Sequence, residues 1–592
     1  MNMLTTLDVW DTLIRRSCHP EFLKLGTARY VFLHSGIHLK EGYANSWDIY
    51  KLRVAAEATL ANEALAIGHD NEYEISNVLR RWLEQITMGG FDHNLPDHLA
   101  ELELEAEMRC TYSDPSIREF LKNLAAKNSI FLSDFYMCSK RLKRLLSHHG
   151  LNDLVEDGVS SCDVLLNKRS GNLFKYIHKK HGITPAQHVH IGDSLHSDVE
   201  MPRRLGIQAI HFEPEVEHKK RQDVAVFFSD RGALMRHIES EVGRASVTSS
   251  LSDELKEKEA FLLGTKMAPL FVGFVLFLAE SAIRGGLERI FFFTREGEFL
   301  HKVWKTLFMD GSLVGHNLPQ VDILEVSRFA AFFASLQDVS IAEFMRLWRL
   351  CRVNNFDSLL ANLGLSKSEL HEVFLRHGID PVETIEHPGD DARVRNLFQD
   401  SEFVKSIQFK IRHYRPLLQE YLSQKGLPLG TRQAGVVDID CGGSIQYNLC
   451  FLLPDCQIRG FYLGLDKDLK TQPANGSKHA YGPNINVNSE FADLLDIVSV
   501  LEMLCASQCG SVRAYHKVPS GEIVVERFQE TELAQDAAEF SRNFQKGVLS
   551  ACAVWSRFIS THVITSLELR LSSCDIWRKL EQTSEILFAR KT

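Results

Sequence analysis

Side chains that could transfer a phosphoryl group follow three short apolar runs in about the first 200 residues. Asp8 ends the first run, Ser133 ends the second, and Asp193 and Asp198 follow the third, with Lys168 before it. A carboxylate at the tip of a strand can attack phosphorus and form an aspartyl-phosphate. A serine hydroxyl and a lysine ammonium group can hold phosphate oxygens by hydrogen bonds and charge. This order of residue types predicts phosphoryl transfer with Asp8 as the nucleophile.

The same carboxylates could bind a divalent cation. Because a phosphoryl group is highly charged, the nucleophile cannot approach it unshielded. Mg²⁺ prefers hard oxygen ligands near octahedral geometry, usually one or two carboxylates with phosphate and water. We expect Mg²⁺ to be held by Asp8, Asp193 and Asp198, together with the main-chain carbonyl of Trp10.

The leaving group needs a proton, and two acidic residues could donate it as the bond breaks. Asp11 is the first candidate for this general acid and Asp134 is the second. The alternative for Asp11 is that it only caps the turn that follows it.

Short strands that alternate with helices must position these residues. The strands are expected at Met3–Val9, Ser129–Leu132, Val189–Ile191 and Ile207–Phe212. Such alternation predicts an α/β, Rossmann-like domain with a parallel sheet. Open sheets of this class place their sites at the carboxyl ends of the strands. Residues from about 20 to 112 have a helical pattern, which predicts an inserted helical cap.

Length and composition are those of a multidomain globular protein. The 592 residues predict two to four domains, and we expect a first domain at 1–215, a linker at 216–250 and a second α/β domain at 251–592. The net charge of −10 argues against a nucleic-acid surface. The 12 cysteines lack zinc-binding spacing and favour buried thiols in a reducing cytoplasm. The N-terminus lacks a signal-peptide pattern, and the longest apolar run, Met267–Ile283, is shorter than a membrane span and predicts a buried core helix.

The C-terminal half carries a second set of polar residues near the ends of apolar runs. The expected strands are Arg289–Phe293, Val321–Val326, Gly435–Ile439 and Arg459–Gly464. The candidate binding residues are Arg295, Glu296, Arg328, Asp438, Asp440, Gly442, Gly443, Ser444, Lys478 and His479, the last two before a turn.

These residue types could bind a phosphorylated sugar. Two arginines can grip phosphate oxygens in a forked geometry, and the turn at 442–444 can present N–H groups to an anion. Asp438 and Asp440 could bind ribose hydroxyls or Mg²⁺, or deprotonate an acceptor hydroxyl. The alternatives are a buried strand with a glycine turn, structural salt bridges for the arginines, and a solvated loop for Lys478 and His479.

The ordered segments LDVWDTL, IFLSD, LLNKRSGNLF and HIGDSLHSD resemble the motifs of the haloacid dehalogenase (HAD) superfamily. The resemblance implies a Mg²⁺-dependent phosphatase. Phosphatases of this superfamily usually read DxDxT, in which the second Asp protonates the leaving alkoxide, and Trp10 occupies that position here. An aromatic residue also occurs there in the dehalogenase branch, but dehalogenases do not need the carboxylates of Asp193 and Asp198.

Over nearly its full length the chain resembles the bacterial dual-domain ribofuranosyltransferases of surface-polysaccharide assembly. The segments FFFTREGEFL, LEVSRFAAF and VVDIDCGGSIQ carry this resemblance in the second half, with Glu296 in place of Asp and with Asp440 and Cys441 where Gly and an aromatic residue are commoner. It implies transfer of 5-phosphoribose from phosphoribosyl pyrophosphate to a glycan hydroxyl, followed by removal of the 5-phosphate by the first domain. The expected acceptor is lipid-linked, and the expected location is the cytoplasm or the inner membrane surface, with polysaccharide-assembly proteins as partners.

Two other functions fit the same residues. One is a sugar-phosphate phosphatase whose C-terminal region binds a glycan or a protein without catalysis. The other is a non-catalytic assembly protein on a degenerate hydrolase scaffold, which Trp10 would support.

Overall fold

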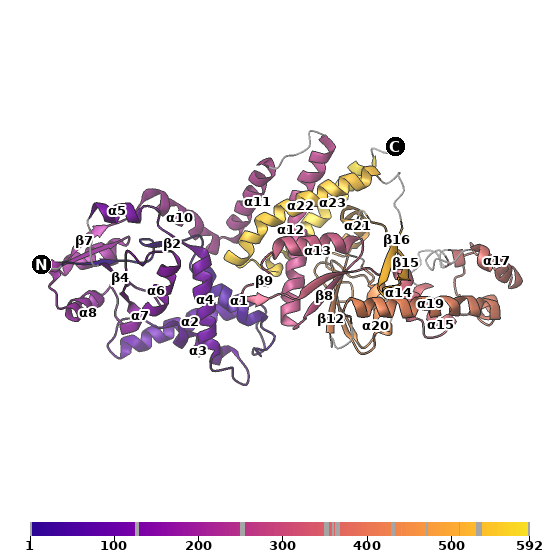
Figure 1. Ribbon diagram of the computed structural model, residues 1–592, viewed down its shortest axis with the longest axis horizontal. Coiled ribbons are helices and arrows are strands. Elements are labelled where there is room, and N and C mark those ends of the chain that lie inside the picture. The colour runs from indigo at the N-terminus through magenta and orange to yellow at the C-terminus, as the bar shows by residue number, and fades with distance from the viewer. Residues whose placement is uncertain are drawn as a thin grey trace. The chain divides into compact units, whose positions relative to one another are not determined.

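The computed structural model describes residues 3–124, 129–248, 255–348, 355–357, 360, 367–427, 433–439, 441–468, 472–507, 509–528 and 535–589. The chain divides into two units. Unit 1 contains residues 1–241, 312–316 and 557–564, and unit 2 contains residues 242–311, 317–556 and 565–592. Each unit has its own five-stranded sheet flanked by helices (Figure 1), which confirms the predicted α/β class.

The sheet of unit 1 is parallel and has the strand order β5-β4-β1-β6-β7. Its strands are β1 (Leu4–Leu7), β4 (Ser129–Ser133), β5 (Gly158–Ser160), β6 (His188–Gly192) and β7 (Gln208–His211). Leu7 at the end of β1 is level with Phe131 in β4 and with Ile191 in β6. The residues that follow these three positions therefore meet at one edge of the sheet.

The helices around this sheet are short and amphipathic. They are α5 (Ile117–Asn123), α6 (Ser139–His148), α7 (Ser161–Val164), α8 (Asn172–His181), η1 (Pro185–Gln187), the π-helical η2 (Leu195–Glu200) and α9 (Met201–Arg204). Leu173, Phe174 and Ile177 of α8 pack with Leu132 of β4 in one apolar cluster.

The predicted cap is a bundle of four helices between two short antiparallel strands, β2 (Ile14–Arg16) and β3 (Thr111–Ser113). The helices are α1 (Glu21–Leu33), α2 (Ser46–Ala66), α3 (Ile75–Ile86) and α4 (Leu95–Cys110). The buried stripe of α3 recurs with helical spacing at Ile75, Val78, Leu79, Trp82, Leu83 and Ile86. The cap also buries charge, because Arg53 is fully buried and pairs with Glu103 at 2.6 Å. Removing one partner of such a pair typically costs about 3–5 kcal/mol.

The segment that the sequence predicts to be a linker is helical. It forms α10 (Glu215–Ser229) and α11 (Arg231–Thr248). Its polar composition reflects helices with few buried positions, such as Phe227 and Leu234, and not an extended chain. This difference matters below because α10 reaches the candidate site.

The sheet of unit 2 is also parallel and has the order β11-β8-β12-β13-β14. The strands are β8 (Arg289–Phe293), β11 (Gln320–Leu324), β12 (Gln433–Asp438), β13 (Gln457–Tyr462) and β14 (Gly476–Ala480). When the five strands are numbered in chain order, they lie side by side as 2-1-3-4-5. The strand order therefore reverses between β8 and β12. Ligand sites in open α/β sheets lie at the carboxyl ends of the strands at such a switch point. β14 contains Lys478 and His479, which the sequence analysis placed before a turn without predicting a strand.

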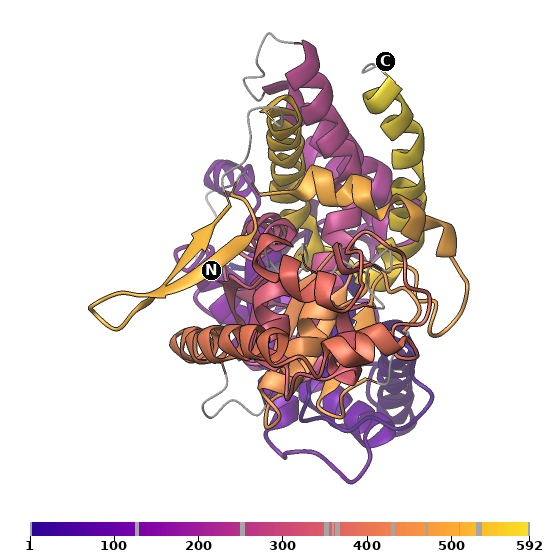
Figure 2. The same cartoon turned by 90° about the vertical axis from the view of Figure 1, so that its right-hand side faces the viewer.

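The other elements of unit 2 are α13 (Glu296–Leu307), α14 (Arg328–Ser335), α15 (Ile341–Trp348), α17 (Lys367–Arg376), α18 (Ala392–Leu397), α19 (Ser401–Gln424), α20 (Ser444–Leu452), η3 (Ala492–Ile497), α21 (Val498–Cys505), β15 (Val512–Lys517), β16 (Ile523–Arg527), α22 (Gln535–Thr561) and α23 (Ser566–Ala589), and residues 557–561 of α22 belong to unit 1. The short strands β9 (Ser312–Leu313) and β10 (His316–Asn317) pair with each other, and residues 312–316 belong to unit 1. The hairpin β15–β16, gold in Figure 2, was not predicted from the sequence.

The long apolar helix α12 (Leu255–Arg284) forms the centre of unit 2. It crosses α22 closely, because Gly264 faces the carbonyl of Phe544 and Gly547 faces that of Phe261, and a Cβ atom at either glycine would lie 2.0 Å from the carbonyl oxygen. The segment Lys256–Arg284 is long and apolar enough to cross a membrane by length and composition, but 72% of its most apolar window is buried inside the protein. The helix is longer than the predicted run, and its burial agrees with the predicted core helix.

Candidate active site

Asp8 follows β1 directly and is buried at the carboxyl edge of the sheet of unit 1. Its main-chain N–H donates to the carbonyl of Ile191 at 2.9 Å, which continues the pairing of β1 with β6. The Lys168 Nζ atom lies 2.6 Å from Asp8 Oδ1 and 2.6 Å from Asp198 Oδ1. Oxygen atoms of Asp8, Asp193 and Asp198 all lie within 4.8 Å of one another. The structure thus brings together four of the predicted site residues.

Burial and neighbouring charges shift the pKa values of this cluster in opposite directions. Burial raises the pKa of Asp8 well above its ordinary value, Lys168 lowers it, and Asp198 and Asp193 raise it further. Burial alone would lower the pKa of Lys168, but Asp198 and Asp8 outweigh burial and raise it. The pKa of Asp198 is held below its ordinary value, since Lys168 and His190 outweigh the effect of burial. Lys168 therefore pairs with two of the three carboxylates, those of Asp8 and Asp198.

The donor set fits Mg²⁺. Three convergent carboxylates are the hard oxygen ligands that this ion takes, usually with phosphate and water completing the shell. Ser133, at the end of β4, is fully buried, and its hydroxyl has no hydrogen-bond partner among the described residues. An unsatisfied buried hydroxyl costs about 1–3 kcal/mol, so its presence favours a bound ligand oxygen as its partner. Mg²⁺ with a phosphate group would satisfy both the carboxylates and this hydroxyl.

The first motif departs from DxDxT at Trp10, which stands in place of the second Asp, and Asp11 follows it. Asp11 has φ = +58°, the left-handed region that Gly, Asn and Asp tolerate best. The Trp10 ring is covered by the Arg16 guanidinium group, whose carbon lies 3.4 Å from the ring centroid, and it packs against Phe135. Trp10 thus fills the place of the usual second acid with a cation–π stack and cannot donate a proton to an alkoxide.

Arg221 of α10 was missed by the sequence analysis. Its Nη1 atom lies 2.8 Å from Asp193 Oδ2 and 3.1 Å from Asp11 Oδ2. Arg15 lies farther from Asp11, at 3.7 Å. Arg221 stands in the predicted linker, and no motif there marks a contact with residues 11 and 193.

His190 of β6 was also missed. Its Nε2 atom lies 3.0 Å from Asp198 Oδ1, and the main-chain N–H of Ser194 donates to Asp198 Oδ2 at 3.0 Å. On its other side His190 contacts Thr6 Oγ1 at 2.6 Å, and Thr6 contacts His188 at 2.8 Å. A buried polar chain therefore holds Asp198. The strand periodicity could have revealed it, because the histidines at 188 and 190 point to the same face.

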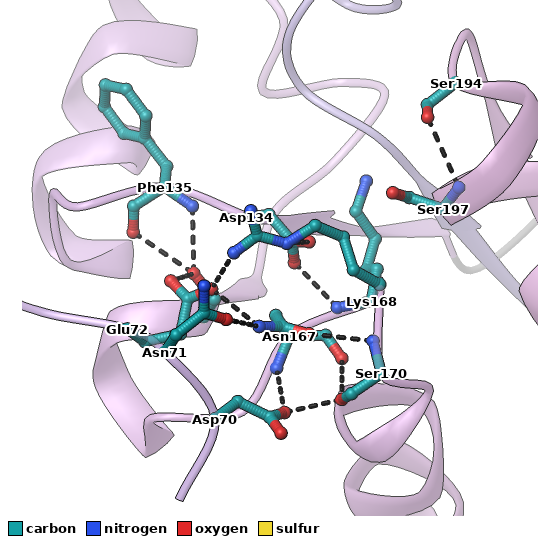
Figure 3. Close-up of polar contacts among 12 residues, drawn as sticks. Asp70, Asn71, Glu72, Asp134, Phe135, Asn167, Lys168, Ser170, Ser194 and Ser197 are labelled. Carbon is teal, nitrogen blue, oxygen red and sulfur yellow. Dashed lines mark hydrogen bonds and ion pairs between the residues drawn. The ribbon is translucent and has the colours of Figure 1, made fainter. Parts of the chain in front are cut away.

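Asp134 follows Ser133 and lies beside Lys168 (Figure 3). Its Oδ1 atom accepts a hydrogen bond from the main-chain N–H of Lys168 at 2.8 Å, and Arg169 Nε lies 3.7 Å from its Oδ2 atom. Burial raises the pKa of Asp134, although Lys168 opposes this. A carboxyl group that keeps its proton more readily is suited to the predicted role of second acid candidate.

In unit 2 the candidate residues lie at the carboxyl edge of the sheet or on β14. Arg295 begins α13 after β8 with φ = +70° and pairs with the buried Glu296 at 2.8 Å. Arg328 begins α14 after β11, and Asp438 ends β12. Asp440 lies outside the described residues.

The Gly-Gly-Ser turn begins α20. Gly443 has φ = +63°, and a Cβ atom there would lie 2.8 Å from Tyr462 Oη, so glycine is required. Lys478 Nζ donates to the carbonyl of Gly442 at 3.1 Å and pairs with Asp468 at 2.7 Å. The Ser444 hydroxyl is buried and has no hydrogen-bond partner within the described part of the chain.

His479 lies on the same strand as Lys478, and its ring stacks on Phe461 with 5.5 Å between the ring centroids. The structure therefore places Lys478, but not His479, in contact with the turn that begins α20.

A family model described as HAD-hydrolase-like matches residues 166–224. This range runs from the Lys168 loop through β6, Asp193 and Asp198 into α10. The N-terminal part of the chain therefore contains a HAD-like hydrolase domain. No curated protein matches the chain in sequence.

Solved structures of the same superfamily resemble about a third of the chain. A 2-haloacid dehalogenase from Pseudomonas syringae pv. tomato DC3000 is 20% identical and covers 36% of this chain and 88% of its own, with a TM-score of 0.26. A HAD phosphatase from Thermococcus onnurineus is 17% identical over 36% and 87%, with a TM-score of 0.24. A putative β-phosphoglucomutase from Thermotoga maritima is 14% identical over 36% and 88%, with a TM-score of 0.25. Similarity at this level carries no conclusion about activity.

Proposed function

We propose that unit 1 is a Mg²⁺-dependent phosphatase that forms a phosphoenzyme on Asp8. The observation that carries this proposal is the convergence of Asp8, Lys168, Asp193 and Asp198 near the end of β4, where the Ser133 hydroxyl has no hydrogen-bond partner among the described residues. Dehalogenation would use Asp8 without the two additional carboxylates.

The proposed reaction has two steps. Asp8 attacks phosphorus, the bond from phosphorus to the leaving oxygen breaks, and that oxygen takes a proton from Asp11 or Asp134. Water then attacks the aspartyl-phosphate and gives its proton to the same acidic residue, which restores Asp8 and releases inorganic phosphate.

Side chains around Asp8 would favour both steps electrostatically. Lys168 lowers the pKa of Asp8 against the larger effect of burial and, with Ser133, would hold oxygens of the phosphoryl group. Mg²⁺ bound by Asp8, Asp193, Asp198 and the Trp10 carbonyl would neutralise charge on the same group. Asp198 would contribute chiefly through Lys168, since its oxygens already accept from Lys168, His190 and Ser194.

We further propose that unit 2 transfers 5-phosphoribose from phosphoribosyl pyrophosphate to a glycan hydroxyl. The support is the position of its candidate residues: Arg295 and Ser444 stand at the ends of β8 and β12, the two sides of the switch point. The N-terminus of α20 offers to an anion its main-chain N–H groups and the buried Ser444 hydroxyl, which has no hydrogen-bond partner in the described part of the chain. Pyrophosphate is a good leaving group, so positioning and charge stabilisation would suffice for the transfer.

Unit 1 would then remove the 5-phosphate from the product. A phosphate ester hydrolyses extremely slowly unaided, which is why this step needs a nucleophile while the first does not. A lipid-linked acceptor, met at the inner membrane surface with polysaccharide-assembly partners, would complete the scheme.

A second candidate function is a sugar-phosphate phosphatase whose unit 2 only binds a glycan or a protein. The observation that favours it is that the family match is confined to residues 166–224 of unit 1.

Mass spectrometry of acceptor reactions separates these proposals. Wild-type protein and Asp8→Asn are each incubated with phosphoribosyl pyrophosphate, Mg²⁺ and candidate glycan acceptors. The two-step scheme predicts a pentosyl product from wild type and a phosphopentosyl product from Asp8→Asn. If wild type hydrolyses sugar phosphates but neither protein modifies any acceptor, the transferase proposal is wrong and the phosphatase proposal stands.

A further inference from the structure

The loop between α2 and α3 of the cap is bonded to the core loop that carries Lys168 (Figure 3). Asp70 accepts hydrogen bonds from the main-chain N–H of Asn167 at 2.8 Å and from Ser170 Oγ at 2.6 Å. It also accepts from Asn172 Nδ2 at 3.0 Å. These three residues surround Lys168 in the sequence.

Glu72 makes a second set of contacts with the same core loop. Its Oε1 atom accepts from Asn167 Nδ2 at 3.0 Å and pairs with Arg169 Nη2 at 2.8 Å. Its Oε2 atom accepts from Ser161 Oγ at 2.6 Å, at the start of α7. Glu72 is therefore bonded to both sequence neighbours of Lys168.

These bonds leave Lys168 little freedom. The side chains of Asp70 and Glu72 direct these bonds to core loops, although both residues belong to the cap. The main-chain N–H of Lys168 is held by Asp134, and its Nζ atom reaches Asp8 and Asp198 at 2.6 Å. A shift of about 1 Å in a group that meets a reacting oxygen can cost on the order of 100-fold in rate.

We propose that Asp70 and Glu72 are positioning residues that hold Lys168 against Asp8 from the cap. The proposal rests on the phosphatase function of unit 1 for its kinetic consequence, but not for its structural one. Neither residue touches the reacting atoms, and their effect passes through the loop at 167–170.

The test uses Asp70→Ala and Glu72→Ala in the full-length chain, with Glu74→Ala as the matched control. Glu74 lies in the same cap loop and also pairs with the core, at 3.1 Å from Arg141, but within the described part of the chain it makes no hydrogen bond or ion pair with the Lys168 loop. Asp70→Asn and Glu72→Gln, which keep the shape of each side chain, serve if the alanine variants fail to fold.

The first readout needs no activity. Lysines are acetylated briefly with acetic anhydride and the modified fraction is measured by peptide mass spectrometry. The side chain of Lys168 is only 3% exposed and should be protected in wild type and Glu74→Ala. We expect its labelling to rise at least about fivefold in Asp70→Ala and Glu72→Ala, with partial protection in Glu72→Gln. Equal labelling of Lys168 in all the variants would overturn the proposal even if the phosphatase function fails.

The second readout is phosphate release from ribose 5-phosphate. We expect kcat to fall about 10- to 100-fold in the two alanine variants with KM changed much less, and Glu74→Ala to stay within about threefold of wild type. Normal kcat in Asp70→Ala and Glu72→Ala would contradict a positioning role. If wild type releases no phosphate, the phosphatase proposal is at fault and the labelling result alone decides.

Discussion

Ser133 and Ser160 end neighbouring strands of unit 1 and stand opposite each other in the β4–β5 register, yet their hydroxyl groups differ. The Ser160 hydroxyl donates to the carbonyl of Phe135 at 2.9 Å, whereas the Ser133 hydroxyl has no partner among the described residues. Both side chains are fully buried. This difference favours a role for the Ser133 hydroxyl in binding a ligand oxygen.

Ser133→Ala should therefore stabilise the protein and slow its release of phosphate. Removing an unsatisfied hydroxyl should raise the free energy of unfolding by about 1 kcal/mol, and loss of a phosphate contact should slow phosphate release about 10- to 100-fold. Ser160→Ala should do the reverse, losing about 1 kcal/mol of stability with activity within a few-fold of wild type. Urea unfolding and steady-state kinetics measure both effects, and a destabilised Ser133→Ala would show that the hydroxyl has a structural role.

The general acid can be identified by comparing two substrates whose leaving groups differ in their need for a proton. A p-nitrophenolate leaves without a proton, whereas the alkoxide of ribose 5-phosphate needs one. The variant that removes the acid should lose about 10²–10⁴-fold on ribose 5-phosphate and little on p-nitrophenyl phosphate. We expect this selective loss in Asp11→Asn or in Asp134→Asn, measured as kcat on the two substrates. Equal losses on both substrates in both variants would exclude the two residues from the acid role.

At the residue scale, sequence order could find residues that strand ends bring together, and the motif segments added Lys168 and Asp198. Asp8, Ser133 and Asp193 follow strands of a parallel sheet, so their proximity follows from the topology. Arg221 and Glu72 reach the site through tertiary packing of a helix and a cap loop, which no spacing along the chain encodes.

At the element scale, α10 brings a cation to the place where a divalent ion would bind. The Arg221 guanidinium group pairs with Asp193 and Asp11 and is half exposed. Mg²⁺ that binds Asp193 must compete with these ion pairs, which are together worth on the order of 1 kcal/mol because solvent screens them.

Arg221→Gln should consequently bind Mg²⁺ about fivefold more tightly than wild type, since 1.4 kcal/mol corresponds to tenfold. Titration calorimetry measures the Kd without substrate. Lys219→Gln, an exposed residue of the same helix, removes the same charge away from the site and should leave the Kd nearly unchanged. Weaker Mg²⁺ binding by Arg221→Gln would show that the arginine supports the ion site.

The strand β6 makes the stability of unit 1 sensitive to acid. His188 is fully buried against Thr6 and His178, and burial lowers its pKa from 6.5 to about 3. Between pH 6.5 and 3 the unfolded chain binds this proton and the folded protein does not. The free energy of unfolding should therefore fall as pH is lowered, by up to about 1.4 kcal/mol per pH unit for this residue.

The comparison is urea unfolding at pH 7, 6 and 5 for wild type, His188→Gln and His69→Gln. His188→Gln should show a shallower loss of stability toward acid, while His69→Gln, which removes an exposed imidazole, should follow wild type. Parallel pH profiles for wild type and His188→Gln would mean that His188 is not held neutral by the fold.

Strands were predictable where a buried strand forms an unbroken apolar run in the sequence. β8 has the predicted bounds, Arg289–Phe293, and β12 lies within two residues of its prediction. The boundary between the two units, at residues 241–242, lies within the predicted linker, but the helices of that segment were not predicted because the exposed faces of α10 and α11 dominate its composition. β14 was missed because its exposed and half-buried residues, GSKHA, form no apolar run.

At the scale of the whole molecule, two parallel sheets each present polar residues at their carboxyl edge. The first edge collects carboxylates around a lysine, and the second collects arginines and a glycine turn that begins a helix. In the proposed scheme the first edge would hydrolyse a phosphate ester and the second would bind a pyrophosphate. The family match lies in the first unit.

Asp8 should become phosphorylated during turnover. Full-length protein is mixed with Mg²⁺ and ³²P-labelled ribose 5-phosphate, quenched in acid within milliseconds to seconds, and digested at low pH for mass spectrometry. We expect a phosphoryl group on Asp8 in wild type and none in Asp8→Asn, which should release no phosphate. Hydrolysis by wild type with no label on Asp8, together with equal hydrolysis by Asp8→Asn, would exclude Asp8 as the nucleophile.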